Sequence, residues 1–210
     1  MHILLTDILT CPRCGPEFGV ILLSHRMEQR RVLEGELGCP GCRHTQPIRN
    51  GFADLRVRAE DVAAESPSTT LPAGSPDEAL ELAALLGVVE GPGNLVLLGS
   101  LAGVAPALAG MIPGIEIVAV DPRLSGWTEA PGVSRMAVGP GLPFRSRSLR
   151  GIALSCAEGE GLLQEAIRAV ARLGRVVVQG AQPGAREILA AEAMEILLDS
   201  NGVAVGQRTS

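Results

Sequence analysis

An alternation of apolar and small-residue segments over residues 94–121 constrains the fold of this chain most. Asn94–Leu98 is an apolar run that ends at Gly99, a helix-compatible segment and a Pro-Gly break follow, and a second apolar run ends at Asp121. This order predicts strand, turn, helix, turn and strand. Such a βαβ unit has a first turn that can approach a nucleotide-like ligand.

The rest of the C-terminal part repeats this alternation. Its strand runs are apolar throughout, which is typical of parallel strands buried on both faces. Strands are expected at Val133–Val138, Gly151–Cys156, Arg175–Gln179 and Val203–Arg208, and helices at Asp77–Val88, Glu158–Arg172 and Ala185–Ser200. The pattern predicts a Rossmann-like, doubly wound α/β fold with a mostly parallel sheet, whose closing antiparallel hairpin is expected to be truncated.

Four of the five cysteines form two CxxC pairs, Cys11 with Cys14 and Cys39 with Cys42. Two residues between thiolates let each backbone turn aim both sulfur atoms at one cation, and two such turns complete a tetrahedral zinc site. Two disulfides or a redox-active pair are the alternatives, and the repeated spacing disfavours both. We therefore predict structural zinc on these four cysteines, without an open coordination position for catalysis.

The segments DILTCPRC and GELGCPGCRHTQPIRNGFADL, within about residues 3–57, resemble the small zinc-ribbon family that activates tRNA, rRNA and release-factor methyltransferases. The chain keeps Pro47, Ile48 and Gly51 of that pattern, whereas Gln46 and Ala53 replace an aromatic residue and a proline. The resemblance implies a module that covers apolar surface on a methyltransferase partner and has no catalytic role of its own.

Residues 59–76 are rich in Ala, Ser, Thr and Pro, a composition that predicts an exposed linker. The linker ends in a helix start, because Ser75 suits an N-cap, Pro76 the first helical position and Glu78 the third. We therefore expect a zinc ribbon over 1–58, a linker over 59–76 and an α/β domain over 77–210.

The motif order over about residues 77–208 resembles the class I S-adenosylmethionine (SAM)-dependent methyltransferases. NLVLLGSLAGVAPALA stands where that family has its glycine-rich first motif, which implies that Gly99 and Gly103 lie at the cofactor. EIVAVD stands at the family's second strand, and LPFRSRSLRGIALS and AIRAVARLGRVVVQG precede its fourth and fifth. The resemblance implies that Asp121 holds the ribose hydroxyls, although an acid here equally suits the cap of a turn at Pro122.

Several positions depart from this pattern where the cofactor would be held. Leu97 replaces an acid two residues before the first glycine, Leu101 replaces the middle glycine, and Val138-Gly-Pro-Gly carries no carboxylate after the third strand. A leucine at the middle position occupies space that only glycine leaves open. No Asn-Pro-Pro-aromatic tetrapeptide follows the fourth strand, which disfavours amino-group methylation. The sequence therefore predicts that the sheet of the methyltransferase fold is retained, whereas the residues that would hold the cofactor are lost.

Charge and composition narrow the classes of function. Residues 1–58 carry eight arginines against six acidic residues, and residues 59–210 carry ten against seventeen. Neither part is a polycation, and one Trp, three Phe and no Tyr offer few faces for stacked bases, so nucleic acid is not expected as a direct ligand. No apolar run reaches the about 20 residues of a membrane span, and no secretion signal opens the chain. We expect a cytoplasmic protein.

Three functions follow from these observations. The first, which we favour, is a non-catalytic methyltransferase-like pseudoenzyme with a fused zinc ribbon, which scaffolds or activates a protein partner or associates with itself; no catalytic residue is assigned. The second is an active SAM-dependent methyltransferase with an atypical pocket, and the third and weaker one is a zinc-ribbon nucleic-acid binder. Trp127 suits either the covering of an adenine ring or an interface, and Cys156 is expected to be an inert buried thiol.

Overall fold

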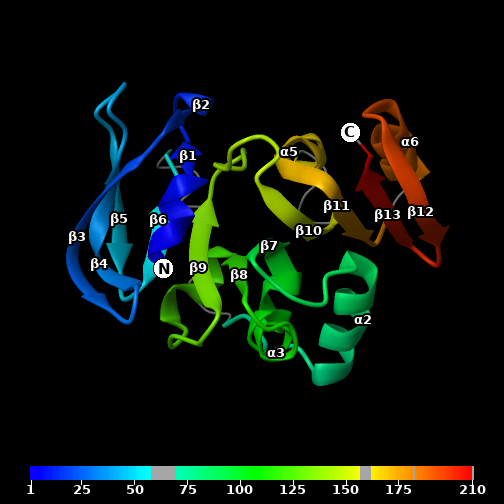
Figure 1. Cartoon of the computed structure of the whole chain (residues 1–210), viewed down its shortest axis with the longest axis horizontal. Coiled ribbons are helices and arrows are strands. Elements are labelled where there is room, and N and C mark those ends of the chain that lie inside the picture. The colour runs from blue at the N-terminus through cyan, green and yellow to red at the C-terminus, as the bar shows by residue number, and fades with distance from the viewer. Residues whose placement is uncertain (58–69, 157–161, 182, 210) are drawn as a thin grey trace.

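The computed structural model describes residues 1–57, 70–156, 162–181 and 183–209. Within these residues, one eleven-stranded sheet runs through the molecule in the order β12-β13-β11-β10-β7-β8-β9-β6-β5-β4-β3 (Figure 1). Its C-terminal seven strands are β7 (Gly93–Leu98), β8 (Ile115–Val120), β9 (Val133–Val138), β10 (Leu149–Ser155), β11 (Val170–Gln179), β12 (Met194–Ser200) and β13 (Val203–Arg208). The N-terminal four are β3 (Ile21–Glu28), β4 (Arg31–Gly38), β5 (Thr45–Arg49) and β6 (Phe52–Leu55), while β1 (Thr10–Cys11) and β2 (Gly15–Gly19) form a separate pair.

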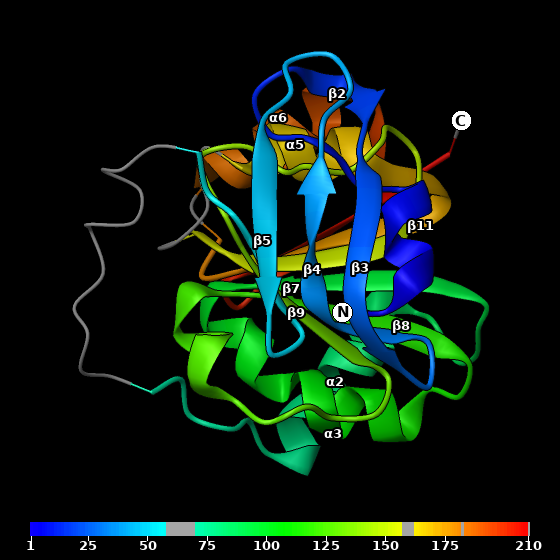
Figure 2. The ribbon, with the colours of Figure 1, turned by 90° about the vertical axis from the view of Figure 1, so that its left-hand side faces the viewer.

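Helices cover both faces of the C-terminal part of the sheet (Figure 2). The helices α2 (Pro76–Leu86) and α3 (Ala105–Met111) lie on one face, and their Leu82 and Leu108 share a core with Leu95 and Leu97 of β7. The opposite face is covered by the 3-10 helix η1 (Ile3–Asp7), α5 (Leu163–Ala169) and α6 (Pro183–Ala191). Strands β7 and β8 are therefore buried on both sides, which explains their unbroken apolar runs.

The expected βαβ unit is confirmed. Strands β7 and β8 pair in parallel from Gly93 opposite Ile115 to Leu98 opposite Val120, and α3 lies between them in the chain. The start of α2 is also as expected. The Ser75 hydroxyl accepts from the Glu78 main-chain N–H, and the Glu78 carboxylate accepts from the Ser75 N–H, so both unpaired donors at this helix end are satisfied.

For two helices, the predicted C-terminal end is wrong, because each helix ends earlier than expected. The helix expected over 185–200 ends at Ala191, and Met194–Ser200 forms β12, which pairs antiparallel with β13. The turn at Asn201 and Gly202 has positive φ at both residues, 52° and 73°, which suits a tight hairpin. The closing hairpin is thus present, contrary to the expected truncation. The helix expected over 158–172 ends at Ala169, where β11 begins; its residues 158–161 lie outside the described part.

The expected linker is only partly described, since residues 58–69 lie outside the described residues. Within residues 70–75, most positions are exposed, but two of them contact the α/β part. Leu71 is buried in the core beside α2 and α3, and the Gly74 N–H donates to the Gly103 carbonyl at 2.9 Å. This segment therefore packs on the first turn of the βαβ unit.

The cysteine-bearing N-terminal part is joined to the α/β part by main-chain pairing. Strand β6 lies parallel to β9, with Phe52 opposite Arg135 and Leu55 opposite Val138. One core spans the junction and includes apolar residues of both parts, among them Leu5, Leu9, Ile48, Val118, Met136 and Phe144. The N-terminal part thus completes one edge and one face of the large sheet.

Two arginines reinforce this junction from opposite sides. Arg31 of β4 donates to both Glu116 oxygens at 2.5 and 2.9 Å, and both side chains are at least four-fifths buried. Arg135 of β9 is almost fully buried and donates to the carbonyl of Asn50 at 2.6 Å and to that of Trp127. Burial lowers the pKa of Arg135. Each charge depends on a partner that only the assembled sheet supplies.

Candidate metal centre and nucleotide crevice

The four cysteines of the CxxC pairs form one cluster. Each offers a sulfur atom, and these atoms all lie within 4.8 Å of one another. The Cys11–Cys42 and Cys14–Cys39 sulfur atoms are 3.7 and 3.8 Å apart. A tetrahedron with zinc–sulfur bonds of about 2.3 Å has edges of about 3.8 Å, so this spacing fits a tetrathiolate zinc centre.

Local backbone structure sets the cluster. In the second turn, the Arg43 N–H donates to the Cys39 carbonyl and the Cys39 N–H donates to the His44 carbonyl, both at 2.9 Å. The Cys42 N–H lowers the pKa of Cys39 to about 7, and the adjacent Cys42 sulfur raises the pKa of Cys14 to about 12. A divalent cation that replaces the thiol protons would compensate the negative charge of the neighbouring sulfur atoms. The four cysteines are therefore positioned to bind a metal.

The three residues expected at a nucleotide lie around the carboxyl ends of β7 and β8. Gly99 begins the 3-10 helix η2 (Gly99–Val104) with a φ of +64°, a conformation that favours glycine. Gly103 lies in the last turn of η2, and Asp121 directly follows β8. These are the positions at which open α/β sheets bind ligands.

The Asp121 carboxylate is already engaged. Its Oδ1 accepts from the main-chain N–H of Arg123 at 2.8 Å and from Nε of the same residue at 2.9 Å, and its Oδ2 accepts from Nη2 at 2.7 Å. Asp121 is 5% exposed and is the N-cap of the 3-10 helix η3 (Pro122–Gly126). A ribose would have to displace this bidentate pair to reach both oxygens.

Arg123 was missed from the sequence, although a signal was present. An acid followed by proline and then by a residue with a long donor side chain favours a short turn in which the acid accepts from two residues onward. The alternative reading of Asp121 as a turn cap is thus confirmed by its contacts with Arg123.

The other departures from the methyltransferase pattern belong to the protein's own packing. Leu97 is fully buried in the core beneath α2 and α3, and the half-buried Leu101 packs against that core. A Cβ on Gly103 would lie 2.3 Å from the Pro72 carbonyl oxygen, so this glycine is required by the approach of residues 71–74. Leu97, Leu101 and Gly103 are therefore all engaged in contacts within the protein itself.

Gly103 offers a stability test of this interpretation. Gly103→Ala is expected to lower the free energy of unfolding by about 1–3 kcal/mol, because the new methyl group must push the Pro72 main chain away. Gly110→Ala in α3 is the matched control, since its Cβ meets nothing within 4 Å, and helix propensity predicts a gain of up to about 1 kcal/mol. Urea denaturation measures both. Equal stability of the two variants would contradict the packing role of Gly103.

The remaining candidate residues also have structural roles. Trp127 is partly buried and packs against the core that includes Leu97 and Leu108, and its carbonyl accepts from Arg135. Cys156 follows β10 and is half-buried against the core on the other face, outside the four-cysteine cluster. Among the described residues, no helix has the length and apolar content that a membrane span requires.

The sheet and the cysteine cluster together define a class: a methyltransferase-type α/β fold with a zinc-ribbon module on its edge. Residues 2–51 match the model of the Trm112p-like protein family. The chain thus joins a Trm112p-like four-cysteine segment to the fold of SAM-dependent methyltransferases. No curated protein matches the sequence significantly.

Solved structures that are similar to this chain include methyltransferases. The MycE methyltransferase of the mycinamycin biosynthetic pathway matches 65% of this chain with a TM-score of 0.51 and 7% identity; the match covers 49% of MycE, about half its length. Precorrin-6y C5,15-methyltransferase from Geobacter metallireducens matches 71% of this chain and 96% of its own, with a TM-score of 0.49 and 13% identity. The N-methyltransferase NodS from Bradyrhizobium japonicum matches 64% of this chain and 96% of its own, with a TM-score of 0.46 and 13% identity.

Proposed function

We propose that this chain is a methyltransferase-like protein that does not bind SAM and acts as a scaffold or activator of a protein partner. The engagement of both Asp121 oxygens by Arg123 is the observation that carries this proposal. Ribose hydroxyls would meet a carboxylate whose charge is already neutralised, and each charge-assisted hydrogen bond lost costs about 1.5–3 kcal/mol. Together with Leu97 and the covered Gly103, this leaves little affinity for a charged nucleoside.

The metal in this proposal is structural zinc on Cys11, Cys14, Cys39 and Cys42. Its support is the sulfur spacing and the absence of a fifth donor position once four thiolates close a tetrahedron. Zinc would hold the ribbon on the sheet and take no part in chemistry.

The outermost strand supports the partner role. Strand β3 ends the large sheet, and its Ile21 and Leu23 are 63% and 58% exposed. An edge strand with unpaired main-chain groups and apolar side chains favours pairing with another chain, either a protein partner or a second copy. The ribbon would then link this partner to the methyltransferase-like sheet.

Titration calorimetry with the zinc-loaded full chain tests the proposal against the second candidate, an active methyltransferase. That candidate has support in MycE, which was solved in complex with Mg and S-adenosylhomocysteine. We expect no saturable heat with SAM or S-adenosylhomocysteine, and no rise in unfolding temperature. A ligand at about 100 times its dissociation constant would add about 2.7 kcal/mol of stability.

Two variants show whether any binding of SAM depends on Asp121 or is prevented by Arg123. Saturable binding by the wild type that is lost in Asp121→Ala would overturn the proposal in favour of the enzyme. Binding that arises only in Arg123→Ala would support it, because removal of this side chain frees the Asp121 carboxylate that the wild type keeps engaged.

A further inference from the structure

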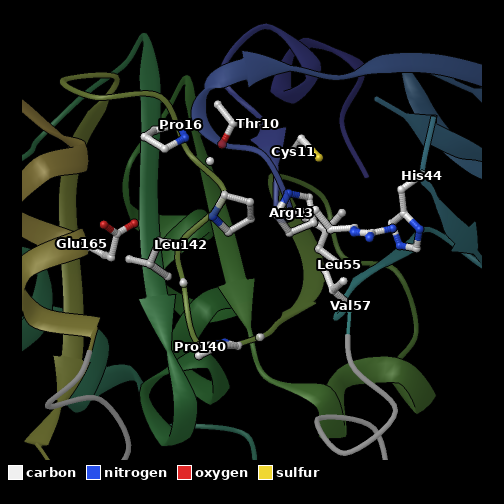
Figure 3. A pocket seen from close by; sticks show the side chains of 15 residues that line it. Thr10, Cys11, Arg13, Pro16, His44, Leu55, Val57, Pro140, Leu142 and Glu165 are labelled. Atoms are coloured by element: carbon white, nitrogen blue, oxygen red, sulfur yellow. The ribbon is translucent and has the colours of Figure 1, made fainter. Parts of the chain in front are cut away.

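A hollow of about 580 Å³ lies between the zinc ribbon and the loop that follows β9 (Figure 3). We call it the interface hollow; its walls include Thr10, Arg13, His44, Leu55, Leu142 and Glu165. Its size lies within the range of small-molecule sites, about 300–1,000 Å³. It opens at the carboxyl ends of the parallel strands β6 and β9, the edge at which α/β sheets bind ligands. Gly99 and Asp121 do not line it.

The two walls are fixed to each other by the main chain. The Thr10 N–H donates to the Pro143 carbonyl at 2.9 Å, and the Arg145 N–H donates to the Ile8 carbonyl at 2.8 Å. Leu9 and Phe144 form a β-bridge between these contacts and are fully buried. The hollow is therefore preformed, and a ligand would not have to order it.

A buried hydroxyl in this hollow has no partner. Thr10 is 1% exposed, and its Oγ1 is one of two buried side-chain polar atoms without a hydrogen bond in the described part of the chain. In Figure 3 this oxygen points into the hollow. Leaving such a group unsatisfied is costly, so native proteins rarely do so without a ligand or another role.

Two basic side chains in the hollow are also unused. Within the described residues, the side chains of Arg13 and His44 have no hydrogen bond or ion pair, and in Figure 3 Arg13 extends toward His44. On the opposite wall, the Glu165 carboxylate is neutralised by Arg168, whose Nε and Nη2 lie 3.2 and 2.8 Å from its two oxygens. The uncompensated charge in the hollow is therefore positive.

We propose that the interface hollow binds a small organic anion, whose carboxylate or phosphate group meets Arg13 and His44 and whose polar edge meets the Thr10 hydroxyl. The apolar body of the ligand lies against Leu55 and Leu142, which line the same space. A bare inorganic ion would fill little of this volume, so the anion is carried on an organic frame. The ligand would touch the ribbon and the α/β part at once.

The zinc centre offers a second role for Arg13. Four thiolates around Zn²⁺ carry a formal charge of −2, and Arg13 lies between two of them in the sequence, so this arginine also offsets that charge. Arg43 provides the matched control. It directly follows Cys42 and so is also a sequence neighbour of a thiolate, but it lines a different hollow beside β3.

Proton NMR of the zinc-loaded full chain tests the proposal with three probes at matched ionic strength: phenyl phosphate, benzoate and uncharged benzyl alcohol. The chain has three histidines, His2, His25 and His44, and only His44 lines the hollow. We expect a saturable shift of the His44 ring resonances with at least one anion and no shift at His2 or His25. Comparison of the two anions shows whether phosphate or carboxylate is preferred.

Variants separate binding from folding. Arg13→Gln is expected to weaken the anion at least about tenfold, because it removes a charge-assisted contact, whereas Arg43→Gln leaves affinity unchanged. Thr10→Val is expected to weaken binding several-fold without lowering the unfolding temperature, since the methyl group replaces an unpaired hydroxyl. The proposal is overturned if neither anion shifts His44, if benzyl alcohol binds equally well, or if Arg43→Gln weakens binding as much as Arg13→Gln.

Discussion

Substituting Cys11 or Cys39 with serine is expected to unfold the N-terminal ribbon and to destabilise the whole chain. Both cysteines are buried, and the first cysteine turn belongs to the short two-stranded β1–β2 sheet. Structural zinc sites contribute roughly 10–16 kcal/mol to the folding of small modules. That is comparable to the total stability of a typical domain, about 5–15 kcal/mol, so loss of one thiolate is not a local event.

The effect is expected to reach the α/β part because the first cysteine turn continues directly into the shared core. Leu9 and Thr10, which precede Cys11, pair with Phe144 and Pro143 across the junction. The single tryptophan, Trp127, reports on this coupling, since its carbonyl and that of Asn50 in the ribbon accept from the same Arg135. Its fluorescence should change when the ribbon unfolds.

Cys156→Ser is the matched control for this prediction. Cys156 is the fifth cysteine, lies outside the cluster, and is only half-buried, so its substitution should leave zinc content and unfolding temperature unchanged. Native mass spectrometry should give one zinc per chain for the wild type and Cys156→Ser, and none for Cys11→Ser. A chelator-treated wild type that keeps its unfolding temperature would contradict the structural role of the metal.

Features that depend on local sequence were predictable. The two CxxC turns fix their sulfur atoms within a few residues, so the cluster followed from spacing alone. The cap at Ser75 and the strands β9 and β13 also match the residues expected, because each is set by a local pattern of polar or apolar side chains.

Features that depend on distant residues could not be predicted from the sequence. The apolar run Ile196–Leu198 suits a helix or a strand equally, and only its pairing with β13 decides for the strand. The Asn201-Gly202 turn carried the missing signal. Likewise, nothing within β6 itself indicates that it adds to the edge of β9, because that pairing depends on residues about eighty positions later in the chain.

Expression of residues 70–210 without the ribbon is expected to give an aggregated or unfolded chain. Strand β9 would become an open edge, and the face covered by η1 would expose side chains such as Val118, Met136 and Phe144. Filling such a face matters, since loss of one buried leucine to alanine already costs about 2–5 kcal/mol, and Leu5 and Leu9 are both fully buried here. Exposed apolar edges also promote pairing between chains.

Loss of the Arg31–Glu116 ion pair would further lower the stability of residues 70–210. Removal of Arg31 leaves the largely buried Glu116 without its bidentate partner, and an uncompensated buried charge costs about 3–5 kcal/mol. A point substitution isolates this part of the effect. Arg31→Met should lower the stability of the full chain by a few kcal/mol, whereas Arg26→Met, in the exposed 4.0 Å pair with Glu28, should change it by less than about 1 kcal/mol.

Co-expression of residues 1–57 as a separate chain should restore a soluble complex, because β6 pairs with β9 through main-chain hydrogen bonds that need no covalent link. Size-exclusion chromatography and circular dichroism check both outcomes, and the rescued complex should contain one zinc. Arg31→Met in the separate ribbon should weaken the rescue, and Arg26→Met should not. If residues 70–210 alone are instead monomeric and unfold cooperatively, the shared core is not required, and the ribbon is an appendage of an independently stable α/β fold.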